Sequence, residues 1–179
     1  MPGVVSLLDE ENSQYVRGLW EALRGEFGFS GLYPESAPHI SYHVADSYDV
    51  EALEASVKTL ARSMPPFDVV TNGLGVFASD DEHIVYLPVV RHPRLTVVQR
   101  TVFDEVDRHA TGDTARYRPV DWVPHITLGR WDAAKNVVPD AVRFLLGHEL
   151  RRSIAINNLS ALEEQGEAHR TLFCYELSA

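Results

Sequence analysis

The chain has 179 residues, of which 45% are hydrophobic and 23% charged, a mixture typical of one globular domain and unlike a disordered or fibrous protein. Its 26 acidic and 16 basic residues give a formal charge of -10, which argues against binding to long duplex nucleic acid, because such binding neutralises many phosphates. The single cysteine, Cys174, excludes an intrachain disulfide and a cysteine-based zinc site. There is no signal-peptide pattern and no run of about 18 apolar residues, so we expect a soluble, cytoplasmic protein without a membrane partner.

The first part of the chain alternates predicted strands and helices. Short β-branched or apolar runs indicate strands, and apolar residues three or four positions apart indicate helices with one buried face. Ser47 or Asp49 is a suitable cap for the second helix, and Pro93 begins the third. The predicted strands span residues 4–8, 39–45, 67–77 and 83–90, and the predicted helices span 13–27, 50–64 and a segment beginning at 93.

After a loop at 110–124 the same order begins again, with a strand at 125–130, a helix at 138–146 and strands at 152–162 and 168–177. His39 and His125 lie at equivalent positions of the two parts, as do His83 and His169. We therefore predict an α+β, bilobal, pseudo-twofold fold in which two antiparallel sheets face a central cleft and helices cover the outer faces. The expected lobes of this single domain (1–179) are residues 39–110, and 125–179 together with 1–27. A chance likeness of two α+β lobes is the alternative.

A repeated tetrapeptide gives the sharpest local signal. Residues 38–41 read PHIS and residues 124–127 read PHIT, and each begins a predicted strand after a loop. Side chains two positions apart in a strand share a face, so His39 lies beside Ser41 and His125 beside Thr127, with the isoleucines opposite. The triplet beginning at His169 also fits the bare pattern but lacks both flanking residues.

Two imidazoles and two hydroxyls in one cleft suit phosphodiester chemistry that needs no metal. Histidine is the only side chain whose ordinary pKa, about 6.5, allows it to act as acid or base near neutral pH. One neutral imidazole takes a proton from water or a ribose hydroxyl, and the other, protonated, gives one to the leaving oxygen. The hydroxyls donate hydrogen bonds to phosphate oxygens as charge develops. Which histidine is the acid stays open at this point.

These motifs resemble those of the 2H phosphoesterase superfamily, which contains bacterial 2′-5′ RNA ligase-like proteins and cyclic nucleotide phosphodiesterases. The family pattern is one His-x-Thr/Ser motif, with x hydrophobic, in each lobe, and residues 39–41 and 125–127 match it. The residues from His125 to Arg130 also resemble the ligase-like branch. The resemblance implies action on 2′,3′-cyclic phosphates of nucleotides or RNA ends, without a cofactor, and we expect a monomer.

We assign the candidate site accordingly. The catalytic candidates are His39 and His125, with strand-end histidines of no function as the alternative. No metal is expected, because a zinc site from His39, His43 and His125 lacks a carboxylate at suitable spacing. His83 and His169 are expected to be strand residues outside the site. The candidate substrate-binding residues are Ser41, Thr127, Arg130, His43, Tyr42, Tyr33 and Trp122.

Several of these assignments have structural alternatives. Strict alternation places Arg130 on the face opposite His125 unless the strand twists or ends. Aromatic residues beside the two loops, such as Tyr42 and Trp122, could stack on a base or could anchor a loop to the core. Three functions compete: a cyclic phosphodiesterase, a 2′-5′ RNA ligase-like enzyme, and a non-catalytic module that binds nucleotides or RNA ends on the same scaffold.

Overall fold

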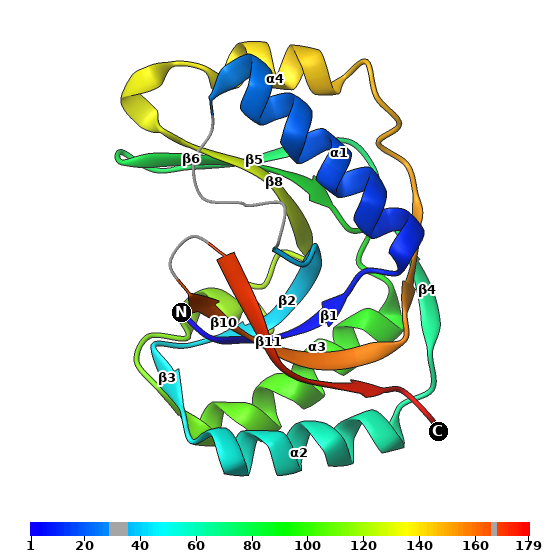
Figure 1. The fold of residues 1–179 in the computed structure, drawn as a ribbon. Coiled ribbons are helices and arrows are strands. Elements are labelled where there is room, and N and C mark those ends of the chain that lie inside the picture. Colours follow the sequence, from blue (N-terminus) through cyan, green and yellow to red (C-terminus); the bar gives the residue numbers. More distant parts are fainter. Residues whose placement is uncertain (29–35, 166–167) are drawn as a thin grey trace.

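A computed structural model describes residues 1–28, 36–165 and 168–179 (Figure 1). It confirms the α+β class, and no helix in these ranges is long and apolar enough to cross a membrane. The strands are β1 (Gly3–Leu7), β2 (His39–Val44), β3 (Ser47–Tyr48), β4 (Phe67–Val70), β5 (Gly75–Ala78), β6 (Glu82–Pro88), β7 (Ala110–Thr111), β8 (His125–Asp132), β9 (Ser153–Ile156), β10 (Asn158–Gln165) and β11 (Ala168–Glu176). The helices are α1 (Glu10–Phe27), α2 (Val50–Ser63), α3 (Pro93–Val106) and α4 (Val138–Leu145).

Two antiparallel sheets form the framework. The larger has the strand order β11-β10-β1-β2 and the smaller has the order β5-β6-β8. Figure 1 shows the smaller sheet above the larger one, with α1 and α4 outside the first and α2 and α3 outside the second. The contacts agree, because α1 packs on β8 and α4 on β6, whereas α3 packs on β2 and α2 on β10 and β11. The faces turned away from the helices are called the inner faces below.

The two repeats exchange strands at the centre of the molecule. The predicted strands 67–77 and 152–162 each divide into two, and their first parts, β4 and β9, pair with each other. The hairpin β5-β6 then joins β8, and the hairpin β10-β11 joins β2 through β1. The strands are thus distributed differently from the lobes expected at 39–110 and at 125–179 with 1–27, although the helices follow that expectation. The reason is that the chain crosses from one sheet to the other after β4 and again after β9.

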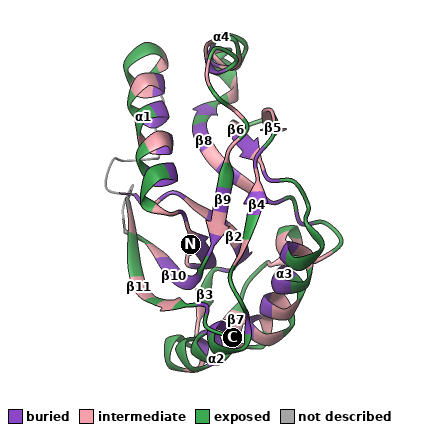
Figure 2. Cartoon of the chain, turned by 90° about the vertical axis from the view of Figure 1, so that its right-hand side faces the viewer, coloured by how far each residue is buried: buried purple, intermediate pink, exposed green. Residues whose placement is uncertain are grey.

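The helices form and end where local chemistry directs them. Asp9 caps α1 by accepting a hydrogen bond from the Asn12 backbone, so this helix begins three residues before the predicted start. Asp49, one of the two expected caps, holds the start of α2 in the same way. Apolar side chains on the covered helix faces, such as Leu23 and Val57, are fully buried. Figure 2 shows buried residues in purple along α1 and α3. Each such side chain stabilises the fold by about 1.5–3 kcal/mol.

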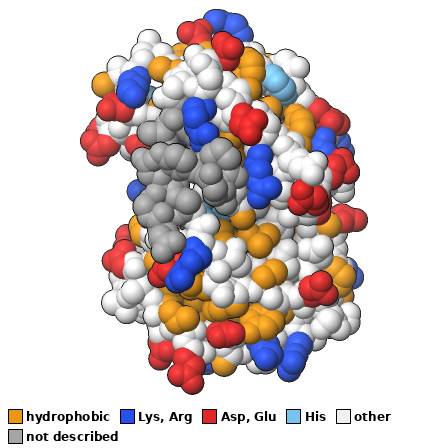
Figure 3. All heavy atoms as spheres, viewed as in Figure 1, with side chains coloured by type: hydrophobic (Ala, Val, Ile, Leu, Met, Phe, Trp, Pro, Cys, Tyr) orange, Lys and Arg blue, Asp and Glu red, His pale blue; other side chains and the backbone are white. Residues whose placement is uncertain are grey.

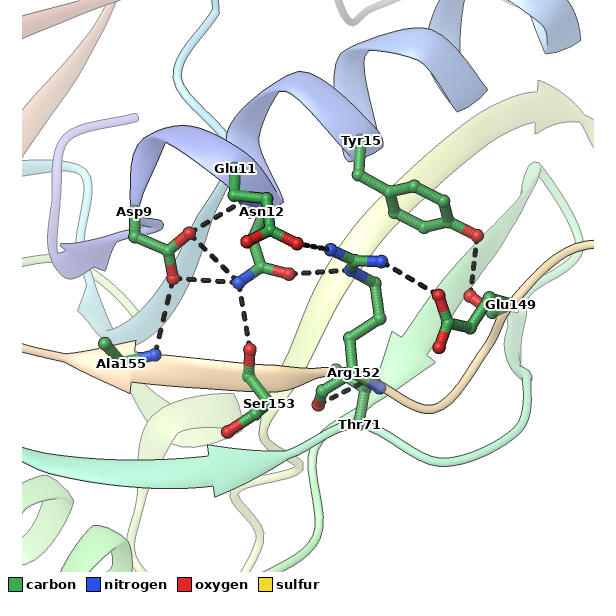
Figure 4. Close-up of polar contacts among 9 residues, drawn as sticks. All are labelled: Asp9, Glu11, Asn12, Tyr15, Thr71, Glu149, Arg152, Ser153 and Ala155. Carbon is green, nitrogen blue, oxygen red and sulfur yellow. Dashed lines mark hydrogen bonds and ion pairs between the residues drawn. The ribbon is translucent and has the colours of Figure 1, made fainter.

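Arg152 fixes the start of α1 to the strand crossing (Figure 4). Its guanidinium donates to the Asn12 amide oxygen at 2.7 Å, forms ion pairs with Glu11 and Glu149, and lies over the Tyr15 ring. Its backbone N–H donates to the Thr71 hydroxyl, just after β4. Arg152, which is partly buried and directly precedes β9, therefore joins α1 through its side chain and the end of β4 through its backbone.

We predict that Asn12→Ala destabilises the protein by about 1–3 kcal/mol, because loss of the buried Asn12 amide group would leave several partly buried partners unsatisfied. The Asn12 amide group donates to the Asp9 carboxylate and to the Ser153 carbonyl, and it accepts from Arg152. Urea unfolding measures the change. Gln14→Ala, two positions along the helix in an exposed contact with Glu10, is the control and should change stability little. Equal stability of the Asn12 variant and the wild type would contradict this role.

Candidate active site

The two motif strands present their polar residues on the inner faces of the two sheets. His39 and Ser41 begin β2, and His125 and Thr127 begin β8; all four are partly exposed. The intervening residues Ile40 and Ile126 are fully buried. In Figure 1 the two strands lie on facing sheets, and β2 and β8 are in contact. The imidazole and hydroxyl of each motif are thus brought toward those of the other.

Both imidazoles are held by the same kind of hydrogen bond. Nδ1 of His39 lies 2.7 Å from the Ala37 carbonyl oxygen, and Nδ1 of His125 lies 2.7 Å from the Val123 carbonyl oxygen. A carbonyl only accepts, so each Nδ1 must carry its proton. In the neutral ring Nε2 is then the basic nitrogen. The two rings are therefore in the same tautomer and ready for proton transfer through Nε2.

Both imidazoles are neutral in the free protein near neutral pH. Burial lowers the pKa of His39 to about 4; the Ala37 carbonyl opposes this, whereas His169 and His125 add to it. Burial also lowers the pKa of His125, against the effect of the Val123 carbonyl. His125, which belongs to the other sheet, thus contributes to the lowering of the pKa of His39.

Two tryptophans hold the motif backbones in equivalent ways. The Trp122 indole N–H donates to the Ser41 carbonyl at 2.8 Å, and the Trp20 indole N–H donates to the Thr127 carbonyl at 3.0 Å. Both rings are buried. Each hydroxyl residue is therefore fixed through its main chain, which leaves its side chain available on the inner face. Burial raises the pKa of the Tyr117 phenol, and the Ser41 side chain is among the groups that oppose this rise.

A β-bulge after each motif reverses the alternation of side chains. Along β2 the register shifts at Tyr42, and along β8 it shifts at Leu128, the equivalent residue. Each bulge inserts one residue, so the side chains beyond it change faces. On β8 this turns Arg130 to the inner face, where it forms an ion pair with Glu82 at 3.4 Å. The strict alternation considered in the sequence analysis fails here, and Arg130 lies on the face of His125.

The bulge in β2 has the opposite consequence for His43. Regular alternation would place His43, a substrate-binding candidate from the sequence, on the face of His39, but the inserted Tyr42 turns His43 toward α3. The ring is fully buried, with Nδ1 2.5 Å from the Tyr48 hydroxyl and Nε2 3.0 Å from the Asp107 carboxylate. His43 therefore joins β2 to the end of α3 instead of contacting a substrate.

The structure also moves two aromatic candidates away from the site. Tyr42 is fully buried, and its hydroxyl is 2.8 Å from that of Ser6. Trp122 is 2% exposed and holds Ser41 as described above. Both rings anchor chain segments to the core, the alternative considered for them, and neither offers a face for stacking. The third candidate, Tyr33, lies outside the described residues.

Three residues that the sequence analysis did not assign to the site lie on the inner faces. The Phe77 and Tyr86 rings stack on each other at 4.2 Å and contact the His125 ring at 5.0 and 5.2 Å. The ring of His169 meets that of His39 edge-on at 5.3 Å. Gly75 gives a sequence signal for the aromatic pair, since a side chain there would occupy the space of the Tyr86 ring.

His83 and His169, at equivalent sequence positions, end on different faces. A third bulge, at Leu172 in β11, turns His169 to the inner face. β6 has no such insertion, and His83 points to the outer side, near α4. The expectation that both lie outside the site is therefore wrong for His169. Among the described residues, no three His, Cys, Asp or Glu side chains are grouped as metal ligands would be.

Comparison with known proteins agrees with this architecture. The model of the 2'-5' RNA ligase superfamily matches residues 10–167, so the chain belongs to this family, the 2H phosphoesterases. No curated protein matches the sequence.

Solved structures show the same fold at low sequence identity. TT0787 of Thermus thermophilus has a TM-score of 0.62 at 15% identity, covering 98% of this chain and 97% of its own. E. coli LigT complexed with 3'-AMP has a TM-score of 0.64 at 15% identity, covering 99% of this chain and 98% of its own. Kluyveromyces marxianus Usb1 has a TM-score of 0.52 at 13% identity, covering 96% of each chain.

We predict that Gly129→Ala destabilises the protein, because Gly129 follows the bulge in β8 and faces a buried ring. A Cβ there would lie 2.3 Å from the Trp131 ring, and overpacking of this kind costs about 1–3 kcal/mol. Thermal unfolding measures the loss. Gly18→Ala is the control, since Gly18 lies on α1 with open space around it, and alanine there should stabilise by up to about 1 kcal/mol. A Gly129 variant as stable as the wild type would contradict the close packing.

Proposed function

We propose that this protein opens cyclic phosphodiesters, with 2′,3′-cyclic phosphates of nucleotides or RNA ends as substrates, by metal-independent acid–base catalysis. The observation that supports this most is the matched pair His39 and His125. Each begins an equivalent strand of a different sheet, has its Nδ1 proton directed to a carbonyl 2.7 Å away, and has a hydroxyl residue two positions later. The family assignment supports the same class of chemistry.

The proposed reaction uses both histidines in one step. One neutral imidazole accepts a proton from water at Nε2 while the water oxygen bonds to phosphorus. The other imidazole, as a cation, donates its proton to the ribose oxygen as the P–O bond breaks, which gives a phosphomonoester and a free hydroxyl. Both imidazoles are neutral in the free protein. The acid must therefore gain a proton when the substrate binds, because a nearby anion favours the charged form of an imidazole.

The remaining inner-face groups suit the developing charge. The hydroxyls of Ser41 and Thr127 are placed to donate hydrogen bonds to phosphate oxygens. Arg130, brought to this face by the bulge, supplies a fixed positive charge, with its side chain about half exposed beside Glu82. Together they would hold a phosphate between the two imidazoles.

A small substrate fits the charge of the protein better than long RNA. The net charge is -10, and the face in Figure 3 shows acidic and basic side chains intermixed without a continuous basic surface among the residues that it colours. Structures of E. coli LigT are described as complexes with 3'-AMP, ATP, NADP+ and phosphate. By analogy of fold, a nucleotide phosphate is the ligand class that we expect here.

The test is turnover of 2′,3′-cyclic mononucleotides and of an RNA with a cyclic phosphate end, with EDTA present. We predict that the wild type hydrolyses at least one of them and that His39→Ala and His125→Ala each lose roughly 10²-fold or more in kcat/KM. His83→Ala, which removes an imidazole from the opposite side of its sheet, is the matched control and should retain activity.

Other outcomes would point elsewhere. Loss of turnover with chelator would contradict the metal-independent mechanism. Joining of the RNA end to a 5′-hydroxyl strand, without hydrolysis, would indicate 2′-5′ RNA ligase-like activity, in which a hydroxyl replaces water as the attacking group. Binding of nucleotides without turnover of any substrate would favour a binding module.

A further inference from the structure

The surroundings of the two matched histidines differ. The His125 ring contacts two uncharged aromatic rings, those of Phe77 and Tyr86. The His39 ring instead meets a second imidazole, His169 of β11, with ring centroids 5.3 Å apart and planes at 83°. A proton added to His39 therefore faces a neighbour that can itself be charged, whereas the aromatic rings in contact with His125 among the described residues carry no charge.

His169 has few partners of its own. Its Nδ1 is buried and has no hydrogen-bond partner among the described residues. Three charged groups act on it from the packed elements: Glu164 of β10, Arg130 of β8 and the amino group of Met1, which is paired with Glu164. Within the described part of the chain, the titratable groups that act on His39 are His169 and His125, and its ring is hydrogen-bonded to the Ala37 carbonyl.

Burial and these charges together determine where a proton is stable. The loss of hydration around His39 is the largest cost of protonating it, and two imidazoles at this distance also repel each other when both are protonated. The pKa of His39 is accordingly about 4. The pKa of His125 is also lowered, but no second imidazole contributes to that lowering. Burial, the Met1 amino group and Arg130 lower the pKa of His169, against the effect of Glu164.

We infer that His169 is a positioning residue that keeps His39 unprotonated, so that His39 is the base and His125 the acid of the proposed reaction. The roles of base and acid rest on the proposed function. The coupling between the imidazoles of His169 and His39 does not depend on it. In the reaction, Nε2 of His39 takes the proton of the attacking water, and protonated His125 gives its proton to the ribose oxygen that leaves phosphorus.

The test is the pH dependence of kcat/KM for a cyclic nucleotide in charge-changing variants. The acidic limb marks the pKa of the base in the free enzyme, and activity falls as the pH falls through it. His169→Gln removes an imidazole that repels a proton on His39 whenever it is itself protonated, so the pKa of His39 rises and the acidic limb moves up by about 0.5–1 pH unit. His169→Lys keeps a positive charge there, so its acidic limb stays at or below that of the wild type.

His83→Gln is the matched control, because His83 is the sequence equivalent of His169 but lies on the outer side of its sheet. Its pH profile should superimpose on that of the wild type. A packing role for His169 would move the Gln and Lys profiles in the same direction, and this result would overturn the inference. An unchanged acidic limb in His169→Gln would also overturn it.

A second measurement separates this inference from the proposed function. NMR titration of the His39 ring without substrate should give a higher pKa in His169→Gln than in the wild type, and no rise in His169→Lys. If the protein turns over no cyclic phosphate, the proposed function fails, while this titration still shows whether the two imidazoles are coupled. If turnover is present but the His39 titration is the same in all variants, the inference alone fails.

Discussion

The site depends on the antiparallel pairing of β4 with β9, a contact of only four residue pairs. At this contact each repeat passes its hairpin to the sheet that contains the other repeat's histidine strand. Val69, Ile154 and Ile156 are buried there, and the Thr71 hydroxyl donates to the Leu150 carbonyl just beyond it. The short apolar pairing of β4 with β9, with the Thr71 hydrogen bond at its end, therefore makes the two sheets face each other. Two repeats that kept all their own strands would not be held in this way.

The sequence predicts the order of the elements well because periodicity and caps are local properties. The motif strands, the four helices and the cap at Asp49 follow from residues that act within a few positions of each other. The division of segment 67–77 was not predicted, although Gly73, with φ +79°, lies at the break. The equivalent segment 152–162 is also divided into two strands, at Asn157. No residue there marks the break as clearly as Gly73 does, since the strands on both sides have an ordinary composition.

The site was predicted less completely because three bulges reverse the alternation on which its faces were assigned. Those bulges, at Tyr42, Leu128 and Leu172, arise from pairing between distant strands, which no local pattern shows. They turn Arg130 and His169 inward and His43 outward. The motif residues precede the bulges in their strands. Alternation alone therefore places His39 with Ser41, and His125 with Thr127, on the inner faces of their sheets.

The place of β1 in the larger sheet has a consequence for how the protein folds. Residues 3–7 lie between β2 and β10, so one edge of β1 is paired only when residues 158–165 reach it. Contacts between segments so distant along the chain form slowly, since a long loop must close first. During synthesis the His39 strand and β1 therefore form an incomplete sheet with an open edge, which is prone to association with other chains until the last hairpin emerges.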